Sequence, residues 1–109
     1  MDFVKDVFIQ AIRDKRKIEL TFHSDEDGRP ITRKCAPMDY GPSRKAKDKT
    51  PRFHVWDYES DKKPHPLLLH RKKIIDMRVL DEEFDPAEFI TWDVGAAPWF
   101  VVRDWGEYS

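Results

Sequence analysis

The fold is decided by residues 17–37, which read Lys17-Ile18-Glu19-Leu20-Thr21-Phe22-His23, Ser24-Asp25-Glu26-Asp27-Gly28-Arg29-Pro30 and Ile31-Thr32-Arg33-Lys34-Cys35-Ala36-Pro37. Apolar and polar residues alternate in the first part, which is typical of a half-buried strand. The second part is dense in turn-forming residues. The third part predicts a second, antiparallel strand over residues 31–36 that is stopped by Pro37. Together the three parts predict a β-hairpin.

The residues before this hairpin have a helical pattern. From Asp2 to about Lys15 apolar residues recur at spacings of three and four, which places them on one face of an amphipathic helix. Asp2 can cap the start of this helix, and the cations at its other end suit the negative end of the helix dipole. The apolar face comprises Phe3, Val4, Val7, Phe8, Ala11 and Ile12.

A basic loop and a third strand follow the hairpin. Residues 41–51 hold four cations, one acid and no large apolar side chain, so we expect an exposed loop. Residues 53–58 are rich in aromatics and predict a strand. Because neighbouring side chains of a strand point to opposite faces, we expect His54 to be exposed if Phe53 and Val55 build the core.

Two further strands are expected after a polar turn at residues 59–66. Residues 67–70 predict a short buried strand, and residues 73–80 predict a fifth, in which Asp76 and Arg78 face opposite to Ile75, Met77 and Val79. One helix followed by five short strands favours a mainly β (α+β) domain built on a small twisted sheet or a partly closed barrel.

The charges are sorted along the 109 residues, although their sum is only −1. Residues 1–75 carry 18 basic and 12 acidic side chains, a balance of +6, whereas residues 76–109 carry 2 and 9, a balance of −7. Such sorting indicates a basic body with an anionic partner, and an acidic tail that covers or solubilises it. The alternative is two solvated faces of one small domain.

The C-terminal residues 84–109 differ in composition from residues 1–83, and we treat them as a separate extension. They hold seven of the fourteen aromatic residues but only one cation, Arg103. Asp85 and Pro86 resemble the start of a helix, and residues 99–102 suggest one more strand. Since exposing so many aromatics is costly, we expect the extension to pack on the barrel, on a second copy or on a protein partner.

Composition excludes several classes of protein. The single Cys35 excludes an internal disulfide framework, indicates a cytoplasmic protein and is expected to be a buried thiol. No apolar run approaches the ~20 residues of a membrane span. The four histidines lack a metal-ligand spacing, and no glycine-rich phosphate loop is present. We therefore expect no enzymatic activity, cofactor, metal or membrane contact.

The continuous run from Leu67 to Phe84 resembles the closing pattern of the WYL-domain family, which is an extended Phe-Arg-Leu-Asp-Arg-Ile run, a strand and a terminal Leu-Asp-x-x-Phe. The resemblance covers roughly residues 8–86. It includes Ala11-Ile12-Arg13 leading into Ile18 to Phe22, and Arg33 with Pro37 on the second strand. In the signature strand, Phe53-His54-Val55 stands in place of Trp-Tyr-Leu, and His70 and Lys73 stand where the family has two arginines.

The resemblance implies a five-stranded Sm-like or SH3-like barrel that acts as a ligand sensor in transcription regulation. It implies a partner that is an anionic nucleotide or single-stranded nucleic acid, bound through a basic surface. The alternative is a protein-interaction subunit, or a homodimer, that uses residues 84–109. Only one helix precedes the barrel, so a DNA-reading helix-turn-helix is not expected. The candidate ligand-binding residues are His70, Arg71, Lys72, Lys73, His54, Arg33 and Ser24.

Overall fold

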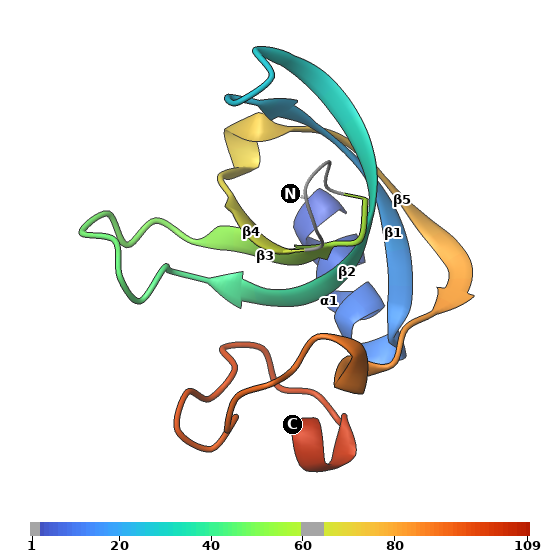
Figure 1. Cartoon of the computed structure of the whole chain (residues 1–109), viewed down its shortest axis with the longest axis vertical. Helices are drawn as coiled ribbons and strands as arrows, with labels where there is room; N and C mark the ends of the chain where they lie inside the picture. The colour runs from blue at the N-terminus through green and yellow to red at the C-terminus, as the bar shows by residue number, and fades with distance from the viewer. Residues whose placement is uncertain (1–2, 60–64) are drawn as a thin grey trace.

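Five antiparallel strands form one strongly bent sheet in the computed structural model, which describes residues 3–59 and 65–109 (Figure 1). The strand order across the sheet is β4-β3-β2-β1-β5. The mainly β, barrel-like fold with one N-terminal helix is therefore confirmed. In chain order the elements are α1 Phe3–Asp14, β1 Arg16–Ser24, β2 Arg29–Gly41, β3 Arg52–Asp57, β4 His65–Leu69, the 3₁₀ turn η1 Arg71–Lys73, β5 Ile74–Glu83, and the 3₁₀ turns η2 Pro86–Glu88 and η3 Gly106–Tyr108.

The predicted hairpin is confirmed as β1 and β2. Ile18 and Leu20 are fully buried, and Ile18 pairs with Cys35 across the ladder. The turn closes through a hydrogen bond of 2.8 Å from the Gly28 amide to the Ser24 carbonyl. Gly28 has a φ of +66°, a left-handed conformation that glycine adopts without steric cost.

The prediction that Pro37 ends the second strand is wrong, because β2 continues to Gly41. The ladder between β1 and β2 ends at the pair Ile18 and Cys35, so beyond that point β2 pairs with β3 alone among the described strands. Pro37 pairs with Val55, and a register shift follows it. A residue without an amide hydrogen is tolerated at such a one-sided, bulged position.

The two edge strands differ from the sequence prediction in burial. β4 exists, but it is not buried, because it lies at the edge of the sheet and Leu68 is 40% exposed. In β5, the register against β1 shifts between the pairs Thr21–Asp76 and Phe22–Ile74. The extra residue is Ile75, which the shift leaves 57% exposed instead of facing the core.

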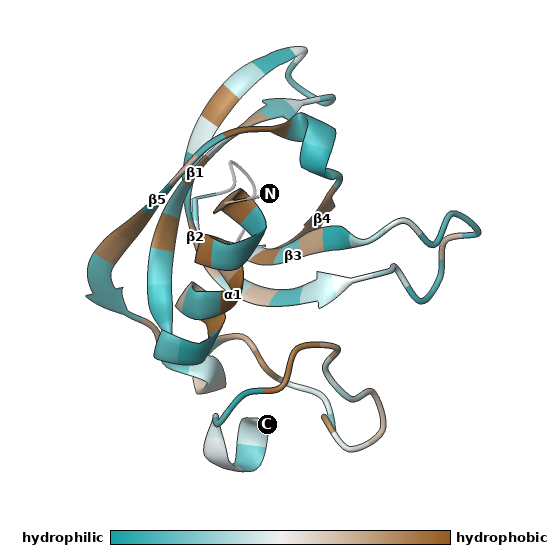
Figure 2. Cartoon of the chain, turned by 180° about the vertical axis from the view of Figure 1, so that it is seen from behind, coloured by the Kyte–Doolittle hydropathy of each residue, from teal (hydrophilic) through white to brown (hydrophobic). Residues whose placement is uncertain are grey.

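The helix α1 lies across the open side of the bent sheet, as Figure 2 shows from behind. Phe8, Ala11 and Ile12 are buried, and the Phe8 ring meets the edge of Phe53 at a centroid distance of 4.9 Å. The predicted helix is therefore confirmed, but Phe3 and Val7 of its predicted apolar face are exposed. The Asp2 cap and most of the predicted turn at residues 59–66 lie outside the described residues. Within the described ranges no helix is long and apolar enough to span a membrane.

The C-terminal residues 84–109 run along the bottom of the barrel in Figure 1. Asp85 caps the short turn η2, as the sequence predicted, although η2 is a single 3₁₀ turn. The structure adds a reciprocal capping box between Asp85 and Glu88. The predicted strand at residues 99–102 does not form, since the structure assigns no strand there. Burial of Phe84, Phe89 and Trp105 joins this segment to the core of the barrel.

Candidate functional site

A buried ion pair fastens the C-terminal segment to β2. The Arg103 Nη2 donates to Asp39 Oδ1 over 3.0 Å, and the two side chains are 1% and 5% exposed. Asp39 also accepts hydrogen bonds from the amides of Phe100 and Val101, at 3.0 and 2.9 Å. The Asp39 carboxylate therefore supplies hydrogen-bond partners to these two amides in place of a neighbouring strand.

Aromatic packing completes this attachment. The Arg103 guanidinium lies over the rings of Trp99 and Trp105, at 4.1 and 4.4 Å from their centroids. The indole Nε1 of Trp105 donates to the Ile12 carbonyl over 2.9 Å, near the end of α1. Helix ends leave carbonyls without an intrahelical partner, so this bond stabilises α1 as well as the segment.

Gly41 is required at the point where the segment crosses β2. A Cβ at this position would overlap the Phe100 ring. The absence of a side chain on Gly41 therefore allows the backbone of β2 and the C-terminal segment to approach closely.

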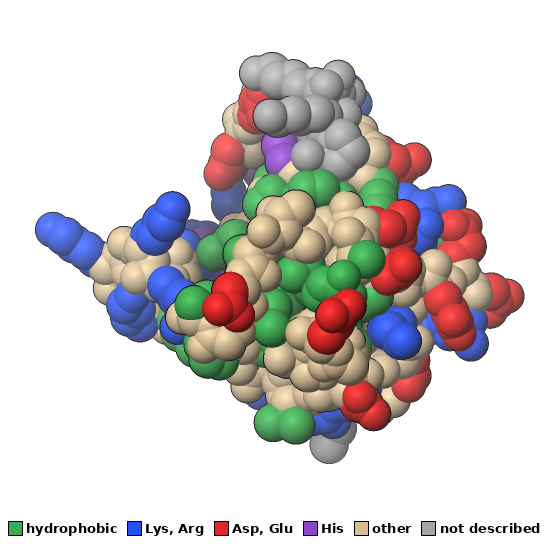
Figure 3. Space-filling view, turned by 60° about the horizontal axis from the view of Figure 1, so that its bottom comes forward, with side chains coloured by type: hydrophobic (Ala, Val, Ile, Leu, Met, Phe, Trp, Pro, Cys, Tyr) green, Lys and Arg blue, Asp and Glu red, His purple; other side chains and the backbone are tan. Residues whose placement is uncertain are grey.

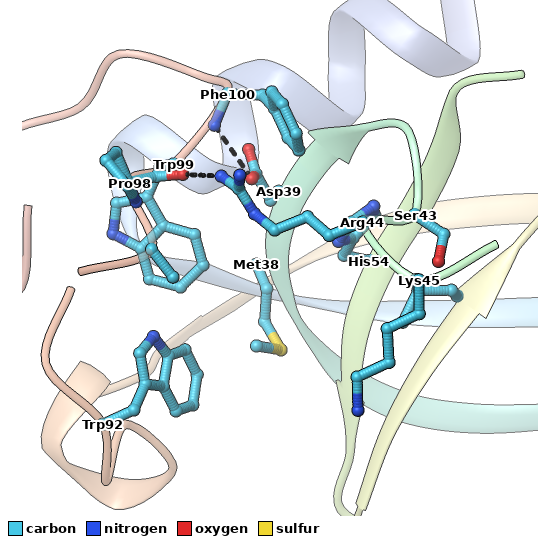
Figure 4. Close-up of a pocket in the computed structure, with 12 residues that line it drawn as sticks. Met38, Asp39, Ser43, Arg44, Lys45, His54, Trp92, Pro98, Trp99 and Phe100 are labelled. Carbon is cyan, nitrogen blue, oxygen red and sulfur yellow. Dashed lines mark hydrogen bonds between the residues drawn. The ribbon is translucent and has the colours of Figure 1, made fainter. Parts of the chain in front are cut away.

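An aromatic pocket of about 340 Å³ lies between the segment and the hairpin of β2 and β3 (Figure 4). Its wall includes Trp92, which is 39% exposed and meets Trp99 edge to face at 5.8 Å. Among the described residues that line it, Asp39 is the only acid, and Arg103 neutralises it. The aromatic pocket is lined by Met38, Asp39, Ser43, Arg44, Lys45, His54, Leu68, Trp92, Ala97, Pro98, Trp99 and Phe100.

The basic loop, residues 42–51, forms the rim of this pocket. Arg44 donates to the Pro98 carbonyl and lies over the Phe100 ring at 4.6 Å. Lys49 folds back to the carbonyls of Ser43 and Arg44, at 2.9 and 3.2 Å. Within the described part of the chain, Lys45 and Lys47 form no hydrogen bond or ion pair. Hydrogen bonds within the loop therefore hold its Lys49 side chain, whereas the charges of Lys45 and Lys47 are not paired with an acid among the described residues.

A cationic hollow of about 380 Å³ borders the far end of the same loop. It brings together three of the predicted site residues, His70, Arg71 and Lys72, after β4. His70 Nε2 lies 4.0 Å from the Asp48 carboxylate. Lys72 has no hydrogen bond or ion pair among the residues the structure describes. The cationic hollow is lined by Tyr40, Asp48, Thr50, Pro51, His70, Arg71 and Lys72.

Ser24 and Lys73 lie in another hollow, which they share with His70. Both side chains are bonded to acidic residues of the turn between β1 and β2. Ser24 Oγ donates to Asp27 Oδ2 over 2.8 Å and accepts from the Asp27 amide over 3.1 Å. Lys73 Nζ pairs with Asp25 Oδ1 at 2.6 Å, which lowers the pKa of Asp25. These residues therefore stabilise the turn between β1 and β2.

Arg33 and His54 do not join the other predicted residues. Arg33 donates to the Glu59 carbonyl, just after the end of β3. His70 lies near the start of β3, because the preceding residue Leu69 pairs with Phe53. His54 faces away from Phe53 as expected, but it is half-buried in the aromatic pocket instead of exposed. Its Nε2 donates to the Gly41 carbonyl over 2.8 Å, and burial lowers its pKa, so the neutral imidazole is favoured.

Trp92, Trp99 and Met38 are the pocket residues that the sequence reasoning missed. Trp92 and Trp99 were recognised only as members of an aromatic-rich tail, and Met38 lies in the part of β2 that Pro37 was expected to exclude. Neither periodicity nor spacing in the sequence places the aromatic-rich tail beside the cation-rich loop, so the sequence carries no signal for this pocket.

The charge sorting along the sequence becomes a sorting in space (Figure 3). In that view the basic loop projects to the left, whereas acidic side chains lie mainly to the right. Glu82 of β5 pairs with Lys34 at 2.8 Å and with Lys17 at 3.6 Å. The acids of β5 thus neutralise cations of β1 and β2, and leave those of the basic loop uncompensated.

The described residues contain no gathering of three or more potential metal ligands. Cys35 is fully buried, as expected, and this burial raises the pKa of its thiol. Comparison with family models, with curated proteins and with solved structures finds no match to this chain.

Proposed function

We propose that this chain is a non-catalytic, regulatory module that binds an anionic nucleotide or single-stranded nucleic acid, as its resemblance to WYL domains implies. The binding surface consists of the basic loop and the cationic hollow. The observation that carries the proposal is that Lys45, Lys47 and Lys72 form no hydrogen bond or ion pair among the described residues, whereas Lys34 and Lys73 are paired with acids.

Phosphate-bearing ligands suit this surface for a physical reason. Neutralising phosphates with Lys or Arg releases the counterions condensed on the nucleic acid, which favours binding at low salt. Cations already paired with carboxylates, such as Lys34 and Lys73, contribute less because the pairing must first be broken. The unpaired cations and Arg71 are therefore the expected phosphate contacts.

The surroundings of Cys35 and His54 support the non-catalytic part of the proposal. A nucleophilic cysteine needs an accessible thiolate, whereas burial of Cys35 favours its neutral thiol. His54 is held as a hydrogen-bond donor to a backbone carbonyl, and not next to a nucleophile. Neither residue has the arrangement that general acid or base catalysis requires.

The test is a titration with a short single-stranded oligonucleotide at several salt concentrations. We expect the logarithm of the affinity to fall with the logarithm of the salt concentration, by about 0.7 for each phosphate that is neutralised. The double variant Arg71→Ala with Lys72→Ala should reduce this slope by about 1.4 if each residue contacts one phosphate.

The matched control removes two positive charges elsewhere. Lys34 pairs with Glu82 and Arg78 pairs with Glu19. The double variant Lys34→Ala with Arg78→Ala should therefore keep the wild-type slope. Absence of binding at low salt, or equal slopes in wild type and in the Arg71 and Lys72 variant, would contradict the proposal. Binding of a protein partner without salt dependence would support the alternative of an interaction subunit.

A further inference from the structure

We propose that the aromatic pocket is a base-binding site that takes a nucleoside phosphate unit, with its base beside Trp92 and its phosphate near Lys45. This inference rests on the proposed function and assigns the pocket a ligand chemistry. The unit is either a free nucleotide or one residue of a single strand, and the experiment below distinguishes these sources.

The size and walls of the pocket favour a planar, largely apolar group. Its volume of about 340 Å³ lies within the ~300–1,000 Å³ range of small-molecule sites. Trp92, Met38 and Leu68 supply aromatic and apolar surface to the lining. Figure 4 shows Trp92 and Lys45 on opposite sides of the space, with the Met38 side chain between them.

The two tryptophans have different roles in this site. Trp99 is fixed, because its Nε1 donates to the Tyr108 carbonyl over 2.7 Å and its ring lies against Arg103. Trp92 is 39% exposed, although Phe89 and Trp105 of the same segment are buried to more than nine tenths. Phe100 of the same pocket is 42% exposed, but the Arg44 guanidinium lies over its ring at 4.6 Å. Trp92 is therefore a ring available for stacking, and Trp99 supports it edge to face.

The charges select an anionic ligand over a neutral apolar side chain. Lys45 has no partner among the described residues, and it shares the rim with Arg44. Both oxygens of Asp39 already accept hydrogen bonds from the segment, so this carboxylate presents no available charge to the pocket. A planar ring that carries a phosphate is complementary to an aromatic wall with a cationic rim.

The experiment measures binding of four ligands to the full chain: a single-stranded oligonucleotide, an abasic oligomer of equal length, a nucleoside monophosphate and ribose 5-phosphate. We expect the ligands with bases to bind about tenfold more tightly than their abasic counterparts, which is at the lower end of the effect of one stacked base. Trp92→Ala should abolish this preference and leave the salt slope of the oligonucleotide unchanged.

Two variants keep the result interpretable. Val102→Ala, which removes an 81% exposed apolar side chain of the same segment outside the pocket, should retain the base preference. Trp92→Phe should retain part of it, because an aromatic face remains. The unfolding midpoints of these variants establish that they fold.

The outcomes separate this inference from the proposed function. Equal, salt-dependent binding of base-containing and abasic oligomers overturns the base site and leaves the anion-binding function intact. A base preference that depends on Trp92 but not on salt supports the base site and contradicts the anion-binding function. Binding of the oligonucleotide without the monophosphate identifies a strand as the source, and equal binding of both identifies a free nucleotide. Binding of none of the ligands at low salt contradicts both proposals.

Discussion

At the scale of single residues, His54 illustrates how burial decides a chemical role. The sequence placed this side chain on the face opposite to Phe53, which is correct, and predicted that it would be exposed. The C-terminal segment, which follows many residues later in the chain, covers that face and half-buries the imidazole. Burial favours the neutral ring, so we expect His54 to form a wall of the aromatic pocket and not a charged contact to phosphate.

This burial makes the stability of the fold sensitive to pH. In the unfolded chain a histidine binds its proton near pH ~6.5, whereas the lowered pKa of folded His54 delays protonation to lower pH. The unfolded state therefore binds more protons in this window, and the stability contributed by neutral His54 is present above pH ~6.5 and is lost as the pH falls below it.

The measurement is the urea midpoint of wild type and of His54→Gln across this pH window. Gln can still donate a hydrogen bond to the Gly41 carbonyl, but it does not titrate. We expect the midpoint of wild type to fall more steeply towards acidic pH than that of the variant. Parallel pH profiles would show that His54 does not contribute to the pH dependence.

At the scale of elements, the contact between β2 and the C-terminal segment holds the site together. The pair Asp39 and Arg103 lies at its centre, and the same segment supplies Trp92 and Trp99 to the aromatic pocket. Removing one partner of a buried ion pair leaves the other charge uncompensated in a poorly solvated place, which typically costs about 3 to 5 kcal/mol. The pocket should therefore be lost when this attachment fails.

We expect Asp39→Asn to lower the free energy of unfolding by an amount in this range and to change the fluorescence of the tryptophans that lie against Arg103. Glu82→Gln is the matched control, because it removes one carboxylate from an exposed pair. Chemical denaturation followed by tryptophan emission measures both effects. If Asp39→Asn and Glu82→Gln give equal midpoints, the ion pair does not hold the segment.

The sequence predicted the secondary-structure elements better than it predicted the contacts between them. Alternation in residues 18–23 predicts β1 because one face of a strand must be buried, and that rule acts locally. The passage of β2 through Pro37 depends on β1 ending earlier, and the exposure of Ile75 depends on a bulge against β1. The pocket joins Met38 to Trp92 and Trp99 through tertiary packing, for which neither periodicity nor spacing carries a signal.

At the scale of the whole molecule, the distribution of charge explains where an anion should bind. The sequence divided the charge into a basic body and an acidic tail, but it did not indicate which cations the acids would neutralise. Glu82 lies beside Lys17 and Lys34, and Asp25 beside Lys73, so these acids neutralise cations outside the basic loop. The aromatic pocket and the cationic hollow both border this loop.

The most direct test of the binding surface is a map of amide and indole chemical shifts in the folded chain during titration with a single-stranded oligonucleotide at low salt. We expect the changes to concentrate on the basic loop, on residues 70–72 and on the Trp92 indole. The buried indole of Trp105 and the exposed residues Ile75 and Val79 of β5 should remain unchanged. Changes confined to β5, or none at saturating ligand, would contradict the assignment of this surface.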